Sequence, residues 1–178
     1  EVAEIEDVAL RYLDFVKKAQ VSSSRILVIG TGVVGHGLVD GLMKRGCSCV
    51  WAYHEHLPDV RPECASRIRV IRLGEMPEVL KDIDVVISAV PVEEPLLTRS
   101  CHTPMLNPKG TLFIDLGMPH NIDPALDGGS TVVVGLDELK NWIRQGNGTF
   151  SRADALCTQV LEEHREFYDR ILSSIRGE

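Results

Sequence analysis

Three glycines at positions 30, 32 and 35 have the spacing of a turn that can hold a diphosphate. In such a turn Gly30 permits the tight bend, Gly32 leaves the main chain bare where the anion approaches, and Gly35 lets the next helix pack closely. The amino end of that helix adds unpaired N–H groups and a partial positive charge. A turn of the same shape without a nucleotide is the alternative, because a fold does not guarantee a function. The candidate contacts to a dinucleotide are Gly30, Thr31, Gly32, Val33, Val34 and Gly35.

The turn lies between a strand and a helix, as this chemistry requires. Residues 25–30 form a continuous apolar run, which is typical of a strand buried on both faces, and residues 33–45 predict a helix that ends at Gly46. Further strands are predicted at 47–54, 67–73, 84–90, 111–115 and 131–134, and helices at 75–81, within 94–105 and at 137–145. These intervals suit right-handed crossovers between parallel strands. We expect an α/β fold: a doubly wound parallel sheet of six strands, ordered 3-2-1-4-5-6, in a three-layer αβα (Rossmann) arrangement.

Helices are expected to flank this sheet. Residues 1–20 carry apolar side chains at helical spacing, with acids early and lysines late. A second apolar stripe runs from Ser151 along a helix of about 25 residues, which is typical of a packing face or a dimer seam. The expected parts are a leading helix at 1–20, a dinucleotide-binding domain at 21–146 and a long helix within 147–178. The chain does not begin with Met, which suggests a processed or excised piece.

Composition and charge exclude several function classes. The chain has 178 residues, with 19 Lys and Arg against 26 Asp and Glu, so its formal net charge is −7. An acidic surface does not neutralise nucleic-acid phosphates, so we expect no tight nucleic-acid binding. No apolar run approaches the ~18 residues of a membrane span, and the acidic start is unlike a signal peptide. We expect no membrane partner, and leave self-association as a homodimer open.

The five cysteines do not predict a disulfide framework. They are odd in number and include no Cys-x-x-Cys pair, so we expect buried small hydrophobic side chains in a reducing, cytoplasmic compartment. No spacing demands a metal site. Adjacent residues point apart on a strand or a helix, so Cys101 and His102 are not predicted to act as nucleophile and base, and no catalytic residue is assigned. The cysteines are Cys47, Cys49, Cys64, Cys101 and Cys157.

The end of the second strand should distinguish NAD from NADP. An acid about 20 residues beyond the first glycine would bind the 2′-hydroxyl of NAD, but residues 50–54 contain none. Its absence favours NADP, because a carboxylate would repel a 2′-phosphate. Tyr53 and His54 are candidate contacts, and His54, His56 or Arg61 could meet the phosphate. We predict a modest preference for NADPH and leave NAD open.

The fourth strand ends in small residues that a dinucleotide could pass. In a doubly wound sheet this end faces the cofactor crevice, and a proline there turns the chain away. An ordinary strand end without a ligand is the alternative. The candidate contacts are Ser88, Ala89, Val90 and Pro91.

Several motifs together agree with one family. Residues 5–175 resemble the NADPH-binding domain of glutamyl-tRNA reductase, within the shikimate/quinate dehydrogenase-like group, and the start of the long helix that follows it. The resemblance rests on the glycine turn, on residues 84–89 and 134–139, and most specifically on residues 113–124, which read Phe-Ile-Asp-Leu-Gly-Met-Pro-His-Asn-Ile-Asp-Pro. By this resemblance Gly117, Met118 and Pro119 join the candidate cofactor contacts.

Two positions depart from the family pattern. Tyr53-His54-Glu55 stand where the family has Asn-Arg-Thr, and His120 stands where the family has Arg after Pro119. Both changes remove a permanent positive charge, because histidine is charged only part of the time near neutral pH. The affinity for NADPH, or the preference for it, is therefore expected to differ from that of the family.

The resemblance implies an oxidoreductase domain of tetrapyrrole (porphyrin) biosynthesis. In the family, a preceding domain carries the cysteine that takes glutamate from its tRNA as a thioester, and hydride from NADPH reduces it to glutamate-1-semialdehyde. None of the five cysteines matches that nucleophile by position, so we expect a domain that is incomplete for catalysis alone. Its expected partners are the cysteine-bearing domain or other proteins of the pathway.

Two alternatives stay open at this point. One is a stand-alone dinucleotide-binding module that regulates or partners other enzymes of the pathway. The other is a small dehydrogenase acting on a hydroxy acid of the shikimate or quinate type. The second alternative needs a general acid near the crevice, and His102 and His120 are its candidates.

Overall fold

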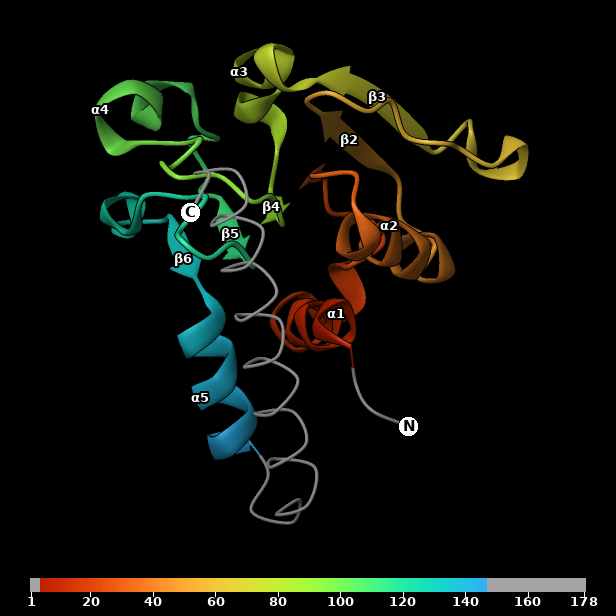
Figure 1. The fold of residues 1–178 in the computed structure, drawn as a ribbon. Helices are drawn as coiled ribbons and strands as arrows, with labels where there is room; N and C mark the ends of the chain where they lie inside the picture. Colours follow the sequence, from red (N-terminus) through yellow and green to blue (C-terminus); the bar gives the residue numbers. More distant parts are fainter. Residues whose placement is uncertain (1–3, 147–178) are drawn as a thin grey trace, which may run out of the picture.

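The core of the molecule is a six-stranded parallel sheet. The computed structural model describes residues 4–146, so the helix predicted within 147–178 and Cys157 lie outside the described residues. All strand pairs are parallel, in the order β3-β2-β1-β4-β5-β6, which confirms the predicted topology (Figure 1). The strands are β1 (Ile26–Ile29), β2 (Cys49–Tyr53), β3 (Ile68–Arg72), β4 (Val85–Ser88), β5 (Leu112–Asp115) and β6 (Val132–Val134).

Helices cover both faces of the sheet. The α-helices are α1 (Ile5–Lys17), α2 (Val33–Lys44), α3 (Met76–Val79), α4 (Arg99–His102) and α5 (Leu136–Gly146). Short 3₁₀ turns occur at Lys18–Gln20, Pro62–Cys64, Leu73–Glu75, Leu80–Asp82, Thr103–Met105 and Pro124–Leu126. In Figure 1, α1, α2 and α5 lie on one side of the sheet and α3 and α4 on the other. This is the predicted three-layer αβα arrangement, with one layer of long helices and one of short ones.

Each face of the sheet has its own apolar core. The core beneath α1, α2 and α5 includes Leu13, Leu38 and Trp51, and the opposite core includes Leu80 and Phe113. β1, β4 and β5 are buried along their whole length, because central parallel strands are covered on both sides. β3, at the edge, is less covered, and only its residue Ile71 is buried. The central strands therefore form a rigid platform for the loops at their ends.

The leading helix α1 packs directly onto α2. A Cβ added at Gly41 would overlap the Leu10 side chain, and one added at Gly37 would overlap Glu6. The absence of side chains at these two glycines therefore lets α1 and α2 pack closely. Arg45, just after α2, donates to the Asp14 carboxylate of α1 at 2.9 Å.

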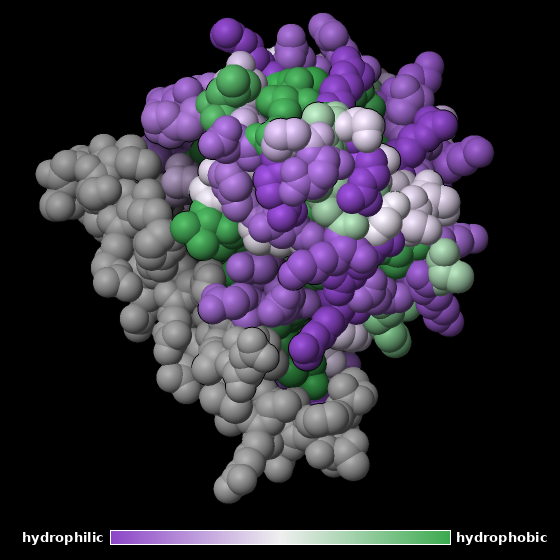
Figure 2. Space-filling model, turned by 90° about the vertical axis from the view of Figure 1, so that its right-hand side faces the viewer, coloured by the Kyte–Doolittle hydropathy of each residue, from purple (hydrophilic) through white to green (hydrophobic). Residues whose placement is uncertain are grey.

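The surface carries isolated apolar side chains. Figure 2 shows a mostly hydrophilic face with scattered hydrophobic residues. Phe15, Val33 and Leu57 are the most exposed of the large ones. No helix within residues 4–146 is long and apolar enough to cross a membrane.

The cysteines divide into two classes, which corrects one prediction. Cys47, Cys49 and Cys64 are buried as expected, but Cys101 is exposed, so its assignment to the interior is wrong. Cys101 lies on α4, which is a single turn that buries none of its residues. The segment 94–105 contains Pro95 and Pro104, and proline cannot continue a helix interior, so little of it is helical.

Candidate functional site

The glycine turn follows β1 and opens α2. Gly30 has a φ of +117°, a conformation that side chains rarely tolerate, and a Cβ there would lie 2.5 Å from the Ala89 carbonyl oxygen. A Cβ at Gly35 would overlap the Gly30 carbonyl, so α2 packs tightly onto the turn. A Cβ at Gly32 would meet nothing within 4 Å, so the main chain there faces open space. The three glycines thus have the three separate structural tasks that their spacing predicts.

The amino end of α2 is not capped by a side chain. Its N-cap residue is Gly32, and the first helical bond runs from the His36 N–H to the Gly32 carbonyl at 3.0 Å. The amides of residues 33–35 precede that bond, and such first-turn amides have no partner within their own helix. The Thr31 hydroxyl donates instead to the His56 carbonyl at 3.1 Å, which holds the loop after β2 beside the turn. Val33 is 83% exposed at the same place. This arrangement fits a diphosphate, whose oxygens would accept hydrogen bonds from those amides.

Trp51 braces the turn from β2. Its buried indole N–H donates to the Gly30 carbonyl at 2.7 Å, and the Gly30 N–H donates to the Ala52 carbonyl at 3.1 Å. The His36 ring packs edge-on against the indole, with centroids 4.8 Å apart. Sequence reasoning missed this role. The only signal was a large aromatic residue in a strand of small apolar residues.

The residues predicted to contact the adenosine ribose lie at the end of β2. Tyr53 is half-buried, and His54 and His56 are exposed. Arg61 does not join them, because its guanidinium bonds Asp40 of α2 at 3.1 Å and lies 4.0 Å from Glu63. Tyr53 is paired in register with Arg72, the last residue of β3.

The loop after β4 is fixed by one buried amide. Asn121 is fully buried, and its Oδ1 accepts from the Ser88 hydroxyl at 2.7 Å and from the Val90 N–H at 3.0 Å. Its Nδ2 donates to the Val90 carbonyl at 2.8 Å. Ser88 and Ala89 are buried, whereas Val90 and Pro91 are half-exposed. Of these four predicted contacts, only Val90 and Pro91 therefore have side chains that solvent can reach.

The loop after β5 is organised by a buried carboxyl group. Asp115 is 1% exposed, and its oxygens accept from the Gly117 N–H at 2.9 Å and the Ile122 N–H at 3.0 Å. Burial raises the pKa of Asp115, against the lowering effect of these two amides and of His120. The His120 Nδ1 atom lies 3.6 Å from the Asp115 carboxylate.

The residues just beyond this carboxyl group differ in their exposure. Gly117 is buried, and a Cβ there would overlap the Asn121 side chain. Met118 and Pro119, joined by a cis peptide bond, are half-exposed. As in the loop after β4, only part of the predicted set can present side chains to a ligand.

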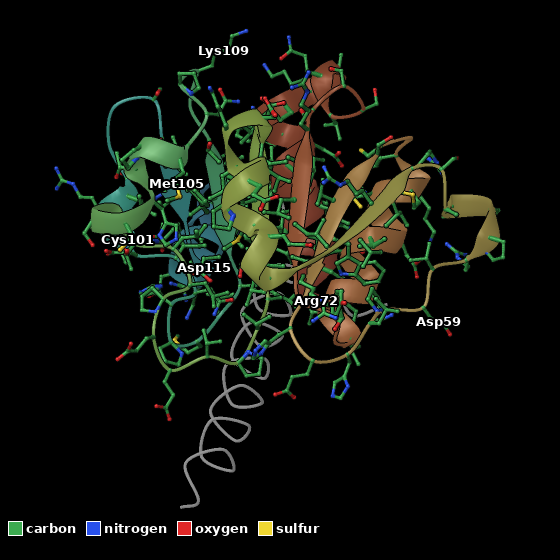
Figure 3. All side chains as sticks on the ribbon, turned by 90° about the horizontal axis from the view of Figure 1, so that it is seen from above. Asp59, Arg72, Cys101, Met105, Lys109 and Asp115 are labelled. Carbon is green, nitrogen blue, oxygen red and sulfur yellow. The ribbon has the colours of Figure 1, made fainter. Side chains whose placement is uncertain are left out.

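All the predicted contacts gather at one edge of the sheet. They end or follow β1, β2, β4 and β5, and the carboxyl ends of parallel strands meet at a single edge. Figure 3 shows Arg72 and Asp115, which end β3 and β5, at that edge, and Lys109, which precedes β5, at the other. Residues far apart in sequence therefore form one continuous candidate site.

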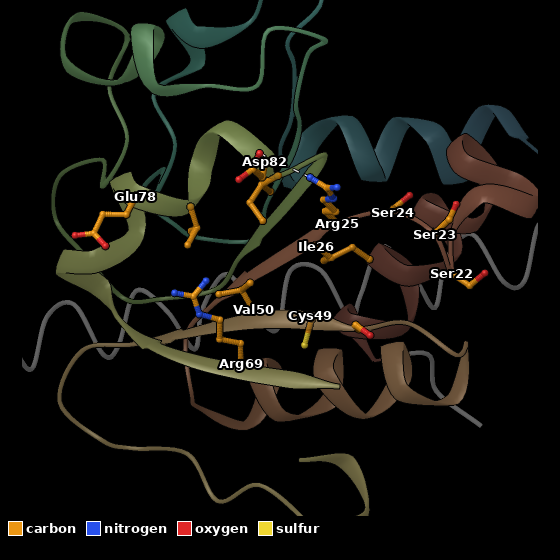
Figure 4. Close-up of a pocket in the computed structure, with 13 residues that line it drawn as sticks. Ser22, Ser23, Ser24, Arg25, Ile26, Cys49, Val50, Arg69, Glu78 and Asp82 are labelled. Atoms are coloured by element: carbon orange, nitrogen blue, oxygen red, sulfur yellow. Dashed lines mark ion pairs between the residues drawn. The ribbon is translucent and has the colours of Figure 1, made fainter. Parts of the chain in front are cut away.

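Two hollows in the described surface lie at the opposite edge. One, of about 400 Å³, is lined by residues that include Ser22–Arg25, Cys49 and Arg69, and the Arg25–Asp82 ion pair of 3.7 Å lies across it (Figure 4). The other, of about 410 Å³, lies beside Lys81 and Lys109. Doubly wound sheets bind their ligands at the carboxyl ends of the strands, and the uncapped helix also lies there. We therefore place the candidate site at the glycine turn and not in either hollow.

Comparison with known proteins identifies the family. The model of shikimate / quinate 5-dehydrogenase matches residues 13–142, which is most of the chain. The chain belongs to the shikimate/quinate 5-dehydrogenase family. Within that family it is similar to glutamyl-tRNA reductases. It is 33% identical to the one of Caldivirga maquilingensis over 93% of this chain, and 32% identical to chloroplastic glutamyl-tRNA reductase 3 of Hordeum vulgare over 84%. The family predicted from the motifs is confirmed.

The same fold is found among solved structures. The nucleotide-binding domain of glutamyl-tRNA reductase from Thermoplasma volcanium matches with a TM-score of 0.57 and 23% identity, over 82% of this chain and 94% of that one. Glutamyl-tRNA reductase from Methanopyrus kandleri matches with a TM-score of 0.58 and 18% identity, over 96% of this chain and 45% of that one. The chain spans 41% and 30% of the two curated relatives described above.

Proposed function

We propose that this domain binds NADP(H) at the glycine turn and supplies hydride for the reduction of glutamyl-tRNA to glutamate-1-semialdehyde. One observation carries the proposal: the bare main chain at Gly32 meets the uncapped amino end of α2, with no atom within 4 Å of a Cβ placed there. A helix start of this kind binds a diphosphate through its amides. The similarity to glutamyl-tRNA reductases supports the choice of reaction.

Each loop at the carboxyl edge has a role in this proposal. The amides of residues 33–35 bind the pyrophosphate, and Tyr53 and His54 lie where the adenosine ribose is bound in such folds. Val90, Pro91, Met118 and Pro119 form the wall beyond the turn, and Asn121 keeps that wall in place through its bonds to Ser88 and Val90. When bound, NADPH supplies the hydride, and the protein supplies position and shelter from water.

The remaining steps of the reaction are assigned to other parts of a larger protein. The chain spans less than half of the length of these two curated relatives. We propose that residues 21–146 act as the cofactor domain, and that a cysteine-bearing domain holds the glutamyl thioester. We also propose a cytoplasmic location for this reaction.

Calorimetric titration of the chain with NADPH and NADH tests the proposal. We expect saturable 1:1 binding of NADPH, with weaker binding of NADH. The absence of binding by both dinucleotides would show that the turn is only a scaffold. A second measurement adds the chain, loaded with NADPH, to a cysteine domain acylated with glutamate. Oxidation of NADPH at 340 nm, at a rate that depends on the acylated partner, is the expected result.

A stand-alone dehydrogenase is the second candidate, and the His120–Asp115 pair favours it. The buried carboxylate lies 3.6 Å from the Nδ1 atom of His120, whose ring is half-exposed at the carboxyl edge. A carboxylate in this position orients an imidazole for proton transfer to or from a hydroxyl group. Turnover of shikimate or quinate with NADP⁺, lost in a His120→Gln variant, would support this function. No turnover by the wild type would exclude these two substrates.

A further inference from the structure

The carboxyl end of β3 places an arginine beside the end of β2. Arg72 is the last residue of β3 and is paired in register with Tyr53, the last residue of β2. Neighbouring strands lie about 4.8 Å apart, and residues paired in register project from the same face of the sheet. Arg72 therefore starts only one strand away from the place where the adenosine ribose is bound in a doubly wound sheet.

The other cations near this ribose position are less suited to hold a phosphate. Arg61 is engaged by Asp40 and Glu63. His54 and His56 are exposed imidazoles, which lack the permanent charge and the planar fork of donors that a guanidinium offers to a phosphate. Lys44, at the far end of α2, is a full helix length away from the turn.

The Arg72 guanidinium is exposed and takes part in no ion pair among residues 4–146. The nearby acid is Glu75, whose carboxylate accepts a hydrogen bond from the backbone N–H of Arg72 at 2.8 Å. That bond ties the Glu75 carboxylate to the main chain at the strand end. The guanidinium is therefore available, and Glu75 is the acid beside it that would oppose an incoming anion.

We propose that Arg72 binds the 2′-phosphate of NADP(H) and sets the preference over NAD(H). The resemblance to the family leads one to expect this arginine directly after β2, where His54 stands. In this chain the charge comes from the adjacent strand. The inference rests on the proposed binding of a dinucleotide at the glycine turn, and it adds the residue that distinguishes the two cofactors.

The test uses two pairs of ligands that differ only in the 2′-phosphate. The 178-residue chain and its Arg72→Gln variant are titrated with NADPH and NADH, and with adenosine 2′,5′-bisphosphate and 5′-AMP. We expect Arg72→Gln to lower the affinity for NADPH and for the bisphosphate about 10-fold, which is the size of one charge-assisted contact. The affinities for NADH and 5′-AMP should stay within about twofold of the wild-type values. Arg72→Lys keeps the charge without the fork and should lie between the two.

Arg69→Gln is the matched control. Arg69 lies on the same strand but lines the hollow at the amino edge (Figure 4). This variant removes the same charge from the molecule, so an equal loss of NADPH affinity in both variants would mean a general charge effect and overturn the assignment. Glu75→Gln should strengthen NADPH binding, because it removes the opposing acid, and unchanged or weaker binding would count against Arg72.

The outcomes separate the two proposals. If the wild type binds neither dinucleotide, the proposed function itself is wrong. If it binds NADPH and Arg72→Gln changes nothing, or weakens NADH equally, only the assignment of Arg72 is wrong. Thermal unfolding of each variant checks that the binding changes do not come from loss of the fold.

Discussion

The indole N–H of Trp51 donates to the carbonyl oxygen of Gly30 at 2.7 Å. A side chain of β2 thus holds the peptide that follows β1 from the buried side of the turn. The other side of the turn stays open at Gly32. The shape of the turn is therefore set before any ligand arrives, which would reduce the conformational entropy lost on binding.

Replacing Trp51 by Phe tests this brace. Phenylalanine keeps much of the apolar ring and removes the donor, so the buried Gly30 carbonyl loses its partner, at a cost of about 1–3 kcal/mol in the free energy of unfolding. Urea denaturation gives that cost, and calorimetry should show weaker NADPH binding. Unchanged values for both would mean that the bond does not position the turn.

Gly32 and Gly35 should separate binding from folding. Gly32→Val places a side chain in open space, so the melting temperature should stay near that of the wild type while NADPH affinity falls by at least about 10-fold, since the side chain occupies the place of the pyrophosphate. Gly35→Ala forces a Cβ onto the Gly30 carbonyl and should lower the melting temperature. A Gly32→Val variant that binds normally would remove the main support for the site.

Asn121 should contribute strongly to stability. Its amide makes bonds to the Ser88 hydroxyl and to both backbone groups of Val90. Asn121→Leu leaves the buried Ser88 hydroxyl and the partly buried backbone groups of Val90 without these partners, so we expect a loss of about 2–4 kcal/mol in the free energy of unfolding. Ser88→Ala removes only one of the bonds and should cost about 1 kcal/mol. Equal losses in the two variants would show that the Val90 contacts contribute little.

Asp115 predicts a particular dependence of stability on pH. Burial raises its pKa above the ordinary value of 3.8, so over the interval above 3.8 the folded state binds more protons than the unfolded state. The stabilising contribution of the protonated group is complete below pH 3.8 and is lost as the pH rises through the folded-state pKa. The stability of the wild type relative to Asp115→Asn should therefore decrease with rising pH in urea titrations. A relative stability that increases with pH would show that the amide bonds and His120 outweigh burial.

The cysteines should react in two groups. Cys101 is exposed, and hydrogen bonds from Thr98 and Ser100 lower its pKa, whereas burial raises the pKa of Cys49 to about 12. Because the thiolate is the reactive form, iodoacetamide near pH 7.5 should label Cys101 before Cys47, Cys49 or Cys64. Peptide mass mapping gives the order, with Cys101→Ser as the control. Early labelling of Cys49 would mean that the edge of the sheet opens in solution.

Local sequence was sufficient for the sheet and the glycine turn. The apolar runs at 25–30 and 84–90 predict buried strands, and the crossover rules then allow few arrangements. The side-chain hydrogen bonds that hold the loops of the candidate site could not be predicted in this way, because each joins residues far apart in sequence. Trp51 bonds residue 30, and Asn121 bonds residues 88 and 90. The exposure of Cys101 was missed because it depends on how short α4 is. Arg72 gave no local signal, since its place beside Tyr53 follows only from the strand register.

One amide side chain, that of Asn121, joins the loops after β4 and β5. A ligand that orders one of these loops therefore also orders the other. The conformational entropy of ordering the two loops is then lost once and not twice. Contacts that the part of a dinucleotide beyond the glycine turn makes with these two loops would consequently reinforce each other. In Asn121→Leu, a fragment such as AMP should bind almost as it does to the wild type. The whole dinucleotide should lose the extra affinity that comes from contacting both loops at once.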